Sequence, residues 1–236
     1  MRRLPFEPRH HLAAIRGCAH LTLLGAVLSV GCGGSPSREV SLTTADGGTV
    51  VADLYAASSH DAVVLAHGAA FDKARWPPFA TWLAGRGHQV LAIDFRGYGR
   101  STAGSDRRAL FEDVLAAVRY LHGQGVARVA VLGASMGGGA TAEAATRAVP
   151  GEIDRVILLS PVPIADPARL RGPLLVIASE QEPMAAQVSE QYRRAPEPKE
   201  LVFLPGTAHG QHIFASDQAE RLRTTVAEFL EQGSTP

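Results

Sequence analysis

The sequence predicts an α/β fold in which a mostly parallel central sheet is covered by helices on both faces. Six short runs are almost continuously apolar, which is typical of strands buried on both faces. Most of these runs are separated by segments with helical periodicity, and such alternation predicts a parallel sheet. The runs cover residues 62–68, 88–97, 128–135, 155–161, 173–179 and 200–206.

The segment before the first apolar run predicts a β-hairpin. Residues 39–55, EVSLTTADGGTVVADLY, alternate apolar and polar side chains on both sides of Asp46-Gly47-Gly48. Aspartate followed by glycine is a common turn sequence between antiparallel strands. We therefore expect two antiparallel strands ahead of the parallel part of the sheet.

Several segments between and after the apolar runs have the pattern of amphipathic helices. One of them starts with prolines and ends at glycine, as helices often do. Another carries apolar residues at the spacing of a single helix face. The segments cover residues 76–87, 106–125, 136–149, 183–195 and 216–230. The apolar face in the second of them consists of Leu110, Val114, Leu115, Val118 and Leu121.

Length and composition favour one well-packed globular domain. The chain has 236 residues, of which 46% are hydrophobic and 19% charged. This is enough for one α/β domain with a buried core, which we place at residues 39–236. The 23 basic and 23 acidic residues balance. A nucleic-acid-binding protein normally has a basic excess, so we expect no nucleic acid as a partner.

The first 31 residues have the layout of an export signal. Basic residues come first, an apolar run follows, and small residues precede Cys32. The apolar run, CAHLTLLGAVLSVGC, is too short to span a bilayer comfortably. The basic residues are Arg2, Arg3, Arg9 and Arg16.

The end of this segment, LSVGC, resembles a bacterial lipoprotein cleavage box, although the usual leucine three positions before the cysteine is missing. The resemblance implies that residues 1–31 are removed, that Cys32 carries lipid, and that residues 32–38 tether the domain to a membrane of the cell envelope. A plain secretory signal and an uncleaved anchor are the alternatives. Since Cys18 is the only other cysteine, we expect no disulfide in the mature domain.

The strongest chemical motif is Gly133-Ala134-Ser135-Met136-Gly137, which joins a predicted strand to a predicted helix. In the pattern G-x-S-x-G, the small residues permit a sharp turn that exposes the serine hydroxyl above the sheet. The helix that follows offers backbone N–H groups and the positive end of its dipole. A tight turn with a capping serine is the alternative interpretation.

Two histidines follow the last apolar run, in FLPGTAHGQH. His209 lies beside a glycine in this loop, where a general base can reach Ser135, and His212 is the second candidate. A third histidine, His67, ends the first apolar run. We expect His67 to be a structural hydrogen-bonding residue, because it precedes Ser135 in the chain.

With these motifs the chain resembles the α/β-hydrolase superfamily from about residue 39 to residue 230. The motifs that carry the resemblance, in chain order, are HGAAF, DFRGYGRS, GASMGGG and PGTAHG. The resemblance implies a serine hydrolase for carboxylic esters that needs no cofactor. It makes Ser135 the nucleophile and His209 the base. The backbone N–H groups of Ala69 and Met136 would bind the oxyanion.

The same resemblance places a carboxylate between the serine and the histidine in the chain. Family members often have aspartate directly before proline after the strand before last, and here Glu182 precedes Pro183. We therefore expect Glu182 to be the acid that orients the histidine. Glu180 and Asp166 are the alternatives. Glutamate in place of aspartate departs from the family pattern.

Other residues near the motifs have structural interpretations. We expect Asp94 and Arg96, in DFRGYGRS, to form an ion pair that shapes the floor of the site. Three aromatic residues either line an acyl pocket or belong to the core or the rim, and the sequence does not separate these possibilities: Phe71, Trp76 and Tyr98. No metal-ligand spacing and no dinucleotide-binding fingerprint occurs.

The connection of residues 161–172, PVPIADPARLRG, has room for one short helix. A cap domain of the kind that many α/β-hydrolases insert here does not fit, so we expect an open site that favours short acyl esters. The alternative is that residues 70–78 close over the substrate.

Two other functions share these motifs: a catalytically silent binding module, and a peptidase or acyltransferase with the same triad.

Overall fold

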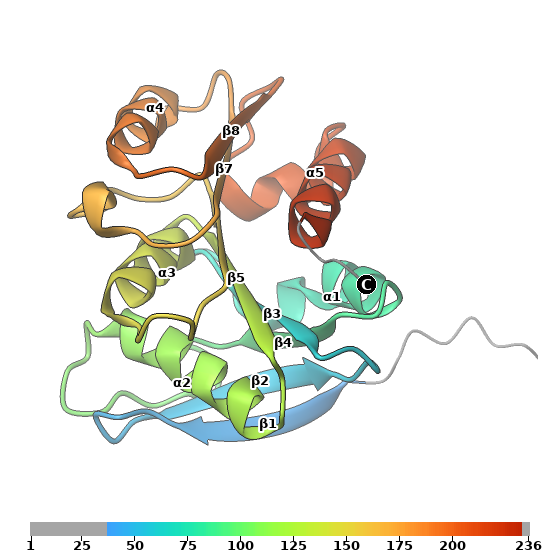
Figure 1. Cartoon of the computed structure of the whole chain (residues 1–236), viewed down its shortest axis with the longest axis vertical. Coiled ribbons are helices and arrows are strands. Elements are labelled where there is room, and N and C mark those ends of the chain that lie inside the picture. The colour runs from blue at the N-terminus through green and yellow to red at the C-terminus, as the bar shows by residue number, and fades with distance from the viewer. Residues whose placement is uncertain (1–36, 233–236) are drawn as a thin grey trace, which may run out of the picture. The chain divides into compact units, whose positions relative to one another are not determined.

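The computed structural model describes residues 37–232, which contain an eight-stranded sheet with the strand order β1-β2-β4-β3-β5-β6-β7-β8 (Figure 1). The hairpin partners β1 and β2 are antiparallel, β2 is antiparallel to β4, and all later pairs are parallel. The predicted signal, residues 1–31, Cys32 and most of the predicted tether lie outside the described residues.

Each apolar run forms a strand, which confirms the predicted mostly parallel sheet. The hairpin predicted around Asp46 is present as well. The strands are β1 (Arg38–Thr43), β2 (Thr49–Tyr55), β3 (Asp61–Ala66), β4 (Gln89–Ile93), β5 (Arg128–Ala134), β6 (Arg155–Leu159), β7 (Leu174–Ser179) and β8 (Lys199–Leu204).

Helices cover both faces of the sheet, as predicted (Figure 1). One face carries α1 (Pro77–Ala84) and α5 (Ala219–Glu231). The opposite face carries α2 (Leu110–Gly123), α3 (Met136–Arg147) and α4 (Ala185–Arg194). Three short 3₁₀ helices lie in the connections: η1 (Lys73–Arg75), η2 (Pro167–Arg169) and η3 (Gly210–Ala215).

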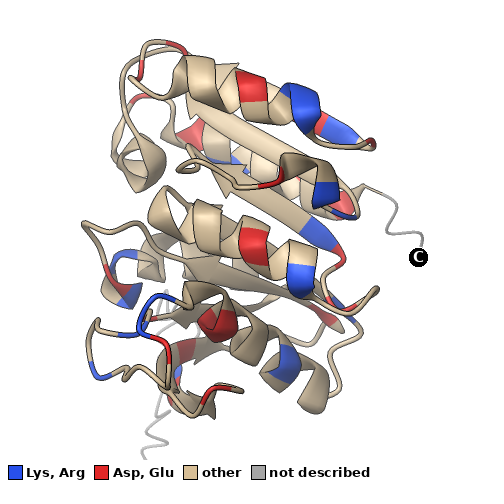
Figure 2. Ribbon diagram, turned by 90° about the vertical axis from the view of Figure 1, so that its left-hand side faces the viewer, with Lys and Arg blue, Asp and Glu red and all other residues tan. Residues whose placement is uncertain are grey.

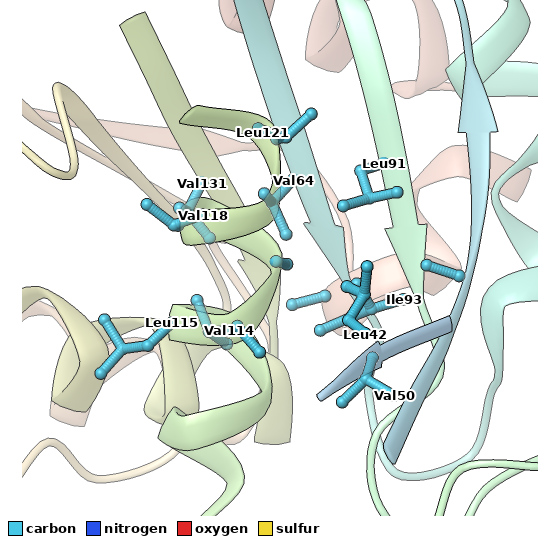
Figure 3. Packing of buried hydrophobic residues seen from close by; sticks show 14 of the residues in the cluster. Leu42, Val50, Val64, Leu91, Ile93, Val114, Leu115, Val118, Leu121 and Val131 are labelled. Carbon is cyan, nitrogen blue, oxygen red and sulfur yellow. The ribbon is translucent and has the colours of Figure 1, made fainter. Parts of the chain in front are cut away.

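The apolar face of α2 packs on the sheet as its periodicity predicts. Side chains such as Val114 and Val118 point towards Val64 and Leu91 in the central strands (Figure 3). Neighbouring residues in the same strands, such as Val63, point to the other face and pack with α1 and α5. This alternation explains the continuous apolar runs, since both faces of each central strand are buried.

Charged residues of both signs are spread over the helices and loops (Figure 2). The strands between the helices carry few of them, in keeping with burial of the sheet on both faces. Within residues 37–232, no helix is both long enough and apolar enough to cross a bilayer.

The ion pair predicted between Asp94 and Arg96 is wrong. The Arg96 guanidinium instead donates hydrogen bonds to Asp113 of α2, at 2.7 and 2.9 Å, and to Asp46 of the hairpin turn, at 2.8 and 3.1 Å. Asp94 accepts a hydrogen bond of 2.7 Å from the Lys73 backbone N–H. Arg96 is therefore a buried link between the hairpin, the loop after β4 and α2.

The hydrogen bonds within this link shift the pKa values of Asp46 and Arg96 in the directions that favour their charged forms. Hydrogen bonds from Arg96 and Thr44 hold the pKa of Asp46 far below its ordinary value. Burial by itself lowers the pKa of Arg96, but the hydrogen bonds to Asp46 and Asp113 outweigh it and raise that pKa. These hydrogen bonds therefore favour the charged form of Arg96.

Replacing Arg96 with methionine should lower the free energy of unfolding by about 3–5 kcal/mol, because the fully buried Asp113 side chain loses its compensating charge. Urea denaturation followed by circular dichroism measures this change. Arg100 provides the matched control, since its side chain is 72% exposed and pairs with Glu39 at the surface. Arg100→Met should cost less than about 1 kcal/mol. Equal losses in the two variants would contradict the role given to Arg96.

Candidate active site

Ser135 lies between the end of β5 and the start of α3, in a strained backbone conformation. Its φ is 52° and its ψ is −110°, a region that residues other than glycine rarely occupy. The Ser135 N–H donates a hydrogen bond of 2.9 Å to the Leu159 carbonyl of the neighbouring strand β6. The hydroxyl does not cap α3. The turn thus presents the hydroxyl above the carboxyl edge of the sheet, where ligands bind in open α/β sheets.

The two glycines of the motif allow the turn to be this tight. A Cβ atom on Gly133 would collide with the carbonyl of Gly137, the second residue of α3. A Cβ atom on Gly137 would collide with the carbonyls of Ala66 and His67 at the end of β3. Small residues at these positions therefore bring β3, β5 and α3 together around Ser135.

A chain of hydrogen bonds joins the serine, the histidine and the carboxylate. Nε2 of His209 lies 2.9 Å from Oγ of Ser135. Nδ1 of the same ring is hydrogen-bonded to Oε2 of Glu182. The three side chains follow β5, β8 and β7, so the sheet assembles them from residues that are far apart in the sequence. Such a chain is able to remove a proton from the hydroxyl and to stabilise the resulting imidazolium.

Of the three candidate acids, the structure places Glu182 against the histidine. Its side chain is fully buried, and Oε1 accepts a hydrogen bond of 3.2 Å from the Ser179 N–H. Glu180 is exposed, and Asp166 lies before η2 in a different loop. Neither is hydrogen-bonded to His209 within the described residues.

Of the two candidate histidines after the last strand, the structure brings His209 to the serine. His212 is exposed, and its ring lies 4.9 Å from that of Phe71, centroid to centroid. The difference follows from the local backbone, because His209 is the residue before η3 whereas His212 lies inside this short helix.

Two buried serines that the sequence interpretation missed hold the histidine loop. Oγ of Ser160, after β6, accepts a hydrogen bond of 3.0 Å from the Gly210 N–H. Oγ of Ser179, at the end of β7, donates one of 2.5 Å to the Ala208 carbonyl. The backbone on both sides of His209 is thereby fastened to the sheet. The sequence did contain a signal for both residues, because Ser179 ends one apolar run and Ser160 is the last residue but one of another.

His67 acts as a structural residue. Its Nε2 accepts a hydrogen bond of 3.1 Å from the Phe95 N–H, so the ring proton is on Nδ1, which lies 2.9 Å from the Gly68 carbonyl. Burial lowers the pKa of His67, which favours this neutral form. The ring therefore joins the loop after β3 to the loop after β4.

The expected oxyanion donors lie next to Ser135, Ala69 in the loop after β3 and Met136 at the first position of α3. Within residues 37–232, the N–H groups of Ala69 and Met136 make no hydrogen bond, so both remain available to a ligand. The loop that carries Ala69 is held by Gln211, whose Oε1 accepts a hydrogen bond of 2.7 Å from the Gly68 N–H. The Tyr98 hydroxyl donates a hydrogen bond of 3.0 Å to the Ala69 carbonyl. Gln211 was not singled out by the sequence.

Comparison with known proteins identifies the superfamily. Residues 57–168 match the family model described as serine aminopeptidase, S33. An uncharacterized protein from Mycobacterium tuberculosis is 30% identical over 178 residues, which cover 64% of this chain and 63% of that protein. A non-heme chloroperoxidase from Streptomyces lividans is 31% identical over 126 residues, which cover 52% of this chain and 45% of that enzyme. The chain thus spans less than two thirds of the length of these curated relatives.

Solved structures agree on the fold. An esterase from Pyrococcus furiosus superposes with a TM-score of 0.71 at 22% identity, over 83% of this chain and 92% of the esterase. A predicted CIB-like hydrolase from Thermoplasma acidophilum superposes with a TM-score of 0.68 at 24% identity, over 82% and 98% of the two chains. This chain belongs to the α/β-hydrolase superfamily.

Two grooves border the site of this α/β-hydrolase. The first, about 750 Å³, extends from Met136 along α3 to the connection between β6 and η2, where Val162 and Ile164 line it. The second, about 240 Å³, lies between the η1 region and η3. A further hollow, lined by Asp61, His88 and other residues, is at the opposite edge of the sheet. Ligands of α/β-hydrolases bind at the carboxyl edge, so we assign no substrate to that hollow.

The aromatic residues for which the sequence left two interpretations open have different surroundings. Trp76 is buried and packs edge-on against Phe214, and it also lines the second groove. Phe71 is half-buried and lines the same groove. Tyr98 is half-buried, with its ring against His67 and its hydroxyl on the Ala69 carbonyl. Tyr98 therefore supports the oxyanion loop and lines neither groove.

Proposed function

We propose that this α/β-hydrolase is a serine hydrolase that cleaves carboxylic esters. One observation carries the proposal: the strained elbow holds the Ser135 hydroxyl 2.9 Å from His209, and the other nitrogen of this ring is hydrogen-bonded to the buried Glu182. A serine that is only structural would have no need of a base and an orienting acid together.

In the first half of the proposed reaction, Ser135 Oγ attacks the ester carbonyl carbon while Nε2 of His209 takes the hydroxyl proton. The carbonyl oxygen becomes an oxyanion that accepts hydrogen bonds from the N–H groups of Ala69 and Met136. The histidine then gives its proton to the leaving alkoxide as the carbon–oxygen bond breaks. An alcohol departs and an acyl-enzyme remains.

In the second half, water replaces the alcohol. His209 takes a proton from the water as its oxygen attacks the acyl carbon, and returns this proton to Ser135 Oγ when the tetrahedral intermediate collapses. The products are a carboxylic acid and the free serine. Throughout, Glu182 accepts the hydrogen bond from Nδ1–H, which keeps Nε2 free to act as the base and stabilises the imidazolium.

An open site supports a preference for short acyl chains. Within the described residues, the connection between β6 and β7 contains only the three-residue helix η2, which cannot form a lid. The segment of residues 70–78 is fastened to the sheet: the Lys73 N–H is bound to Asp94, and its ammonium pairs with Asp53 at 2.8 Å. These bonds oppose closure of that segment over a long chain.

The proposed specificity predicts a steady fall in rate with acyl chain length. Purified protein should have its highest kcat/KM on p-nitrophenyl acetate and butyrate, and progressively lower values from octanoate to palmitate. No jump in rate is expected above the critical micelle concentration of the long esters, because no lid needs an interface to open it. A preference for palmitate, or such a jump, would contradict the open site.

A peptidase is the second candidate, and the family model described as serine aminopeptidase favours it. The same panel decides between the two when it includes p-nitroanilides of alanine and leucine. An esterase should cleave the acetate ester far faster than either anilide. Higher kcat/KM on the anilides would replace the esterase proposal with the peptidase, although the proposed nucleophile would be unchanged.

A further inference from the structure

The turn that follows β6 contacts the loops of both Ser135 and His209. We call residues 159–162, with the sequence LSPV, the β6 turn. Strand β6 pairs with β5, which leads to Ser135, and with β7, which leads to Glu182. The β6 turn therefore lies at the carboxyl edge of the sheet, between two strands that lead to the candidate triad.

Backbone hydrogen bonds from the β6 turn hold Ser135 on both sides. The Leu159 carbonyl accepts a hydrogen bond of 2.9 Å from the Ser135 N–H, and the Val162 N–H donates one of 3.2 Å to the Ser135 carbonyl. Pro161 lies close to α3, since a Cβ atom built on Gly138 would be 3.0 Å from its Cα. The backbone of the proposed nucleophile is therefore fixed relative to this turn.

Ser160 in the same turn holds the loop of the histidine. Its Oγ accepts a hydrogen bond of 3.0 Å from the N–H of Gly210, the residue after His209. Its own N–H donates one of 2.8 Å to the Ile177 carbonyl in β7. Ser160 is 0% exposed and Gly210 is buried, so water does not compete for the bond between them. One turn thus holds the backbone next to both groups that would exchange the proton.

The backbone of Ser160 is strained. Its φ of 47° is in the left-handed region, and within residues 37–232 Ser135 is the only other residue besides the glycines with a positive φ. Such strain costs free energy and is concentrated at functional sites in proteins. Glycine would adopt this conformation without strain, but it has no hydroxyl for the Gly210 N–H. The strain therefore points to a role for the hydroxyl that glycine cannot perform.

Any effect of Ser160 on catalysis has to act through the histidine. Ser160 lines neither of the two grooves beside the candidate active site. Nε2 of His209 lies 2.9 Å from Oγ of Ser135, and the proposed reaction moves a proton between these two atoms. Small misplacements of reacting groups reduce rates steeply, so the position of the histidine loop matters for turnover.

We propose that Ser160 is a positioning residue that sets the distance between His209 and Ser135. Its hydroxyl binds the histidine loop at Gly210, while the backbone on either side of it holds the serine. Without this hydroxyl the buried Gly210 N–H loses its acceptor, and the loop shifts to satisfy it. The effect on turnover rests on the proposed function, whereas the effect on the hydrogen bond between His209 and Ser135 does not.

Two variants of Ser160 separate the hydroxyl from the backbone strain. Ser160→Ala and Ser160→Gly both remove the hydroxyl, but only glycine adopts the native φ without strain. Both should lose kcat on p-nitrophenyl acetate to the same extent, by about 10²-fold, because both misplace the base. KM should stay nearly the same, since Ser160 lines neither groove. In urea denaturation, Ser160→Gly should have the higher midpoint of the two.

Ser101 is the matched control, because it is also a buried serine with hydrogen bonds that join separate segments. Its Oγ donates a hydrogen bond of 2.8 Å to the Asp94 carbonyl and accepts one of 2.9 Å from the Val51 N–H. Ser101→Ala should lower the urea midpoint and leave kcat nearly unchanged. If kcat followed the urea midpoint through all three variants, Ser160 would have a structural role only and the proposal would be overturned.

NMR of full-length protein with ¹⁵N-labelled histidine measures the positioning without turnover. The chain has nine histidines, and the His209→Asn variant assigns the His209 signals. The Nε2 resonance of His209 should move in Ser135→Ala, which removes its hydrogen-bond partner, and also in both Ser160 variants. In Ser101→Ala it should stay in place.

The two measurements distinguish a failure of this inference from a failure of the proposed reaction. A wild type without ester turnover, but with a displaced Nε2 resonance in the Ser160 variants, would reject the reaction and keep the positioning role. An Nε2 resonance that stays in place in both Ser160 variants, or an unchanged kcat in an active protein, would overturn the inference. Circular dichroism checks folding, and Ser160→Gly alone suffices for kinetics and NMR if Ser160→Ala does not fold.

Discussion

Ester turnover should fall by about 10⁶-fold when Ser135 is replaced with alanine. This magnitude is that of removing the nucleophile of a serine protease triad, where the remaining groups cannot form the acyl-enzyme. The protein should remain folded, because Ser135 Oγ contacts His209 and does not cap α3. Initial rates with p-nitrophenyl acetate measure the loss.

A fluorophosphonate probe provides an independent measurement on the same pair of proteins. Wild-type protein should be labelled on Ser135, as mapped by peptide mass spectrometry, and Ser135→Ala should not be labelled. Ser189 on α4, whose hydroxyl binds the Ala185 carbonyl, is the matched control, and Ser189→Ala should retain both labelling and turnover. Labelling that persists in Ser135→Ala would move the nucleophile elsewhere. A folded wild type that resists the probe would favour the silent binding module.

The second large effect is expected at Glu182. Replacing it with glutamine should reduce kcat by about 10⁴-fold, the scale seen when a triad aspartate becomes asparagine. The glutamine NH₂ group cannot accept the Nδ1–H hydrogen bond, so the imidazole would adopt the tautomer that protonates Nε2. That nitrogen is then unable to take the proton from Ser135. Steady-state kinetics with p-nitrophenyl acetate test this loss.

Glu180→Gln is the matched control, because it makes the same chemical change two residues earlier at an exposed side chain. It should leave kcat nearly unchanged, and so should Asp166→Asn. If the Glu180 or the Asp166 variant were the inactive one, another carboxylate would have to reach His209 during catalysis.

Much of the fold was readable from local patterns alone. Strands such as β3 and β5 are buried on both faces, and this leaves a continuous apolar run in the sequence. The turn at Ser135 was readable for the same kind of reason, since a Cβ atom on Gly133 would collide with Gly137 of the same motif. Such features depend on neighbouring residues, and neighbouring residues are what a sequence records.

The hydrogen-bond partners of Arg96 and His209 depended on distances between loops in the folded protein, and the sequence does not give these distances. Asp94 is two residues from Arg96, which made the pair plausible, yet the guanidinium extends to Asp46 and Asp113 because the hairpin turn and α2 come to lie on either side of it. The sequence left Glu182 among three carboxylates in the same way. Glu182 alone of the three contacts His209, since the turn after β7 buries it against the Ser179 N–H.

The sequence by itself therefore determined the α/β class, the order of the strands and helices along the chain, and the sharp turn that carries Ser135. The tertiary structure decided which carboxylate meets His209 and which acids hold Arg96. It also decided that Gln211 supports the loop of Ala69 by binding Gly68, which lies 143 residues earlier in the chain. The physical reason is that secondary structure follows from the spacing of apolar side chains over a few residues. The side chains that form hydrogen bonds at the carboxyl edge of a parallel sheet, by contrast, lie on loops far apart in the chain. These loops meet only after the strands have paired.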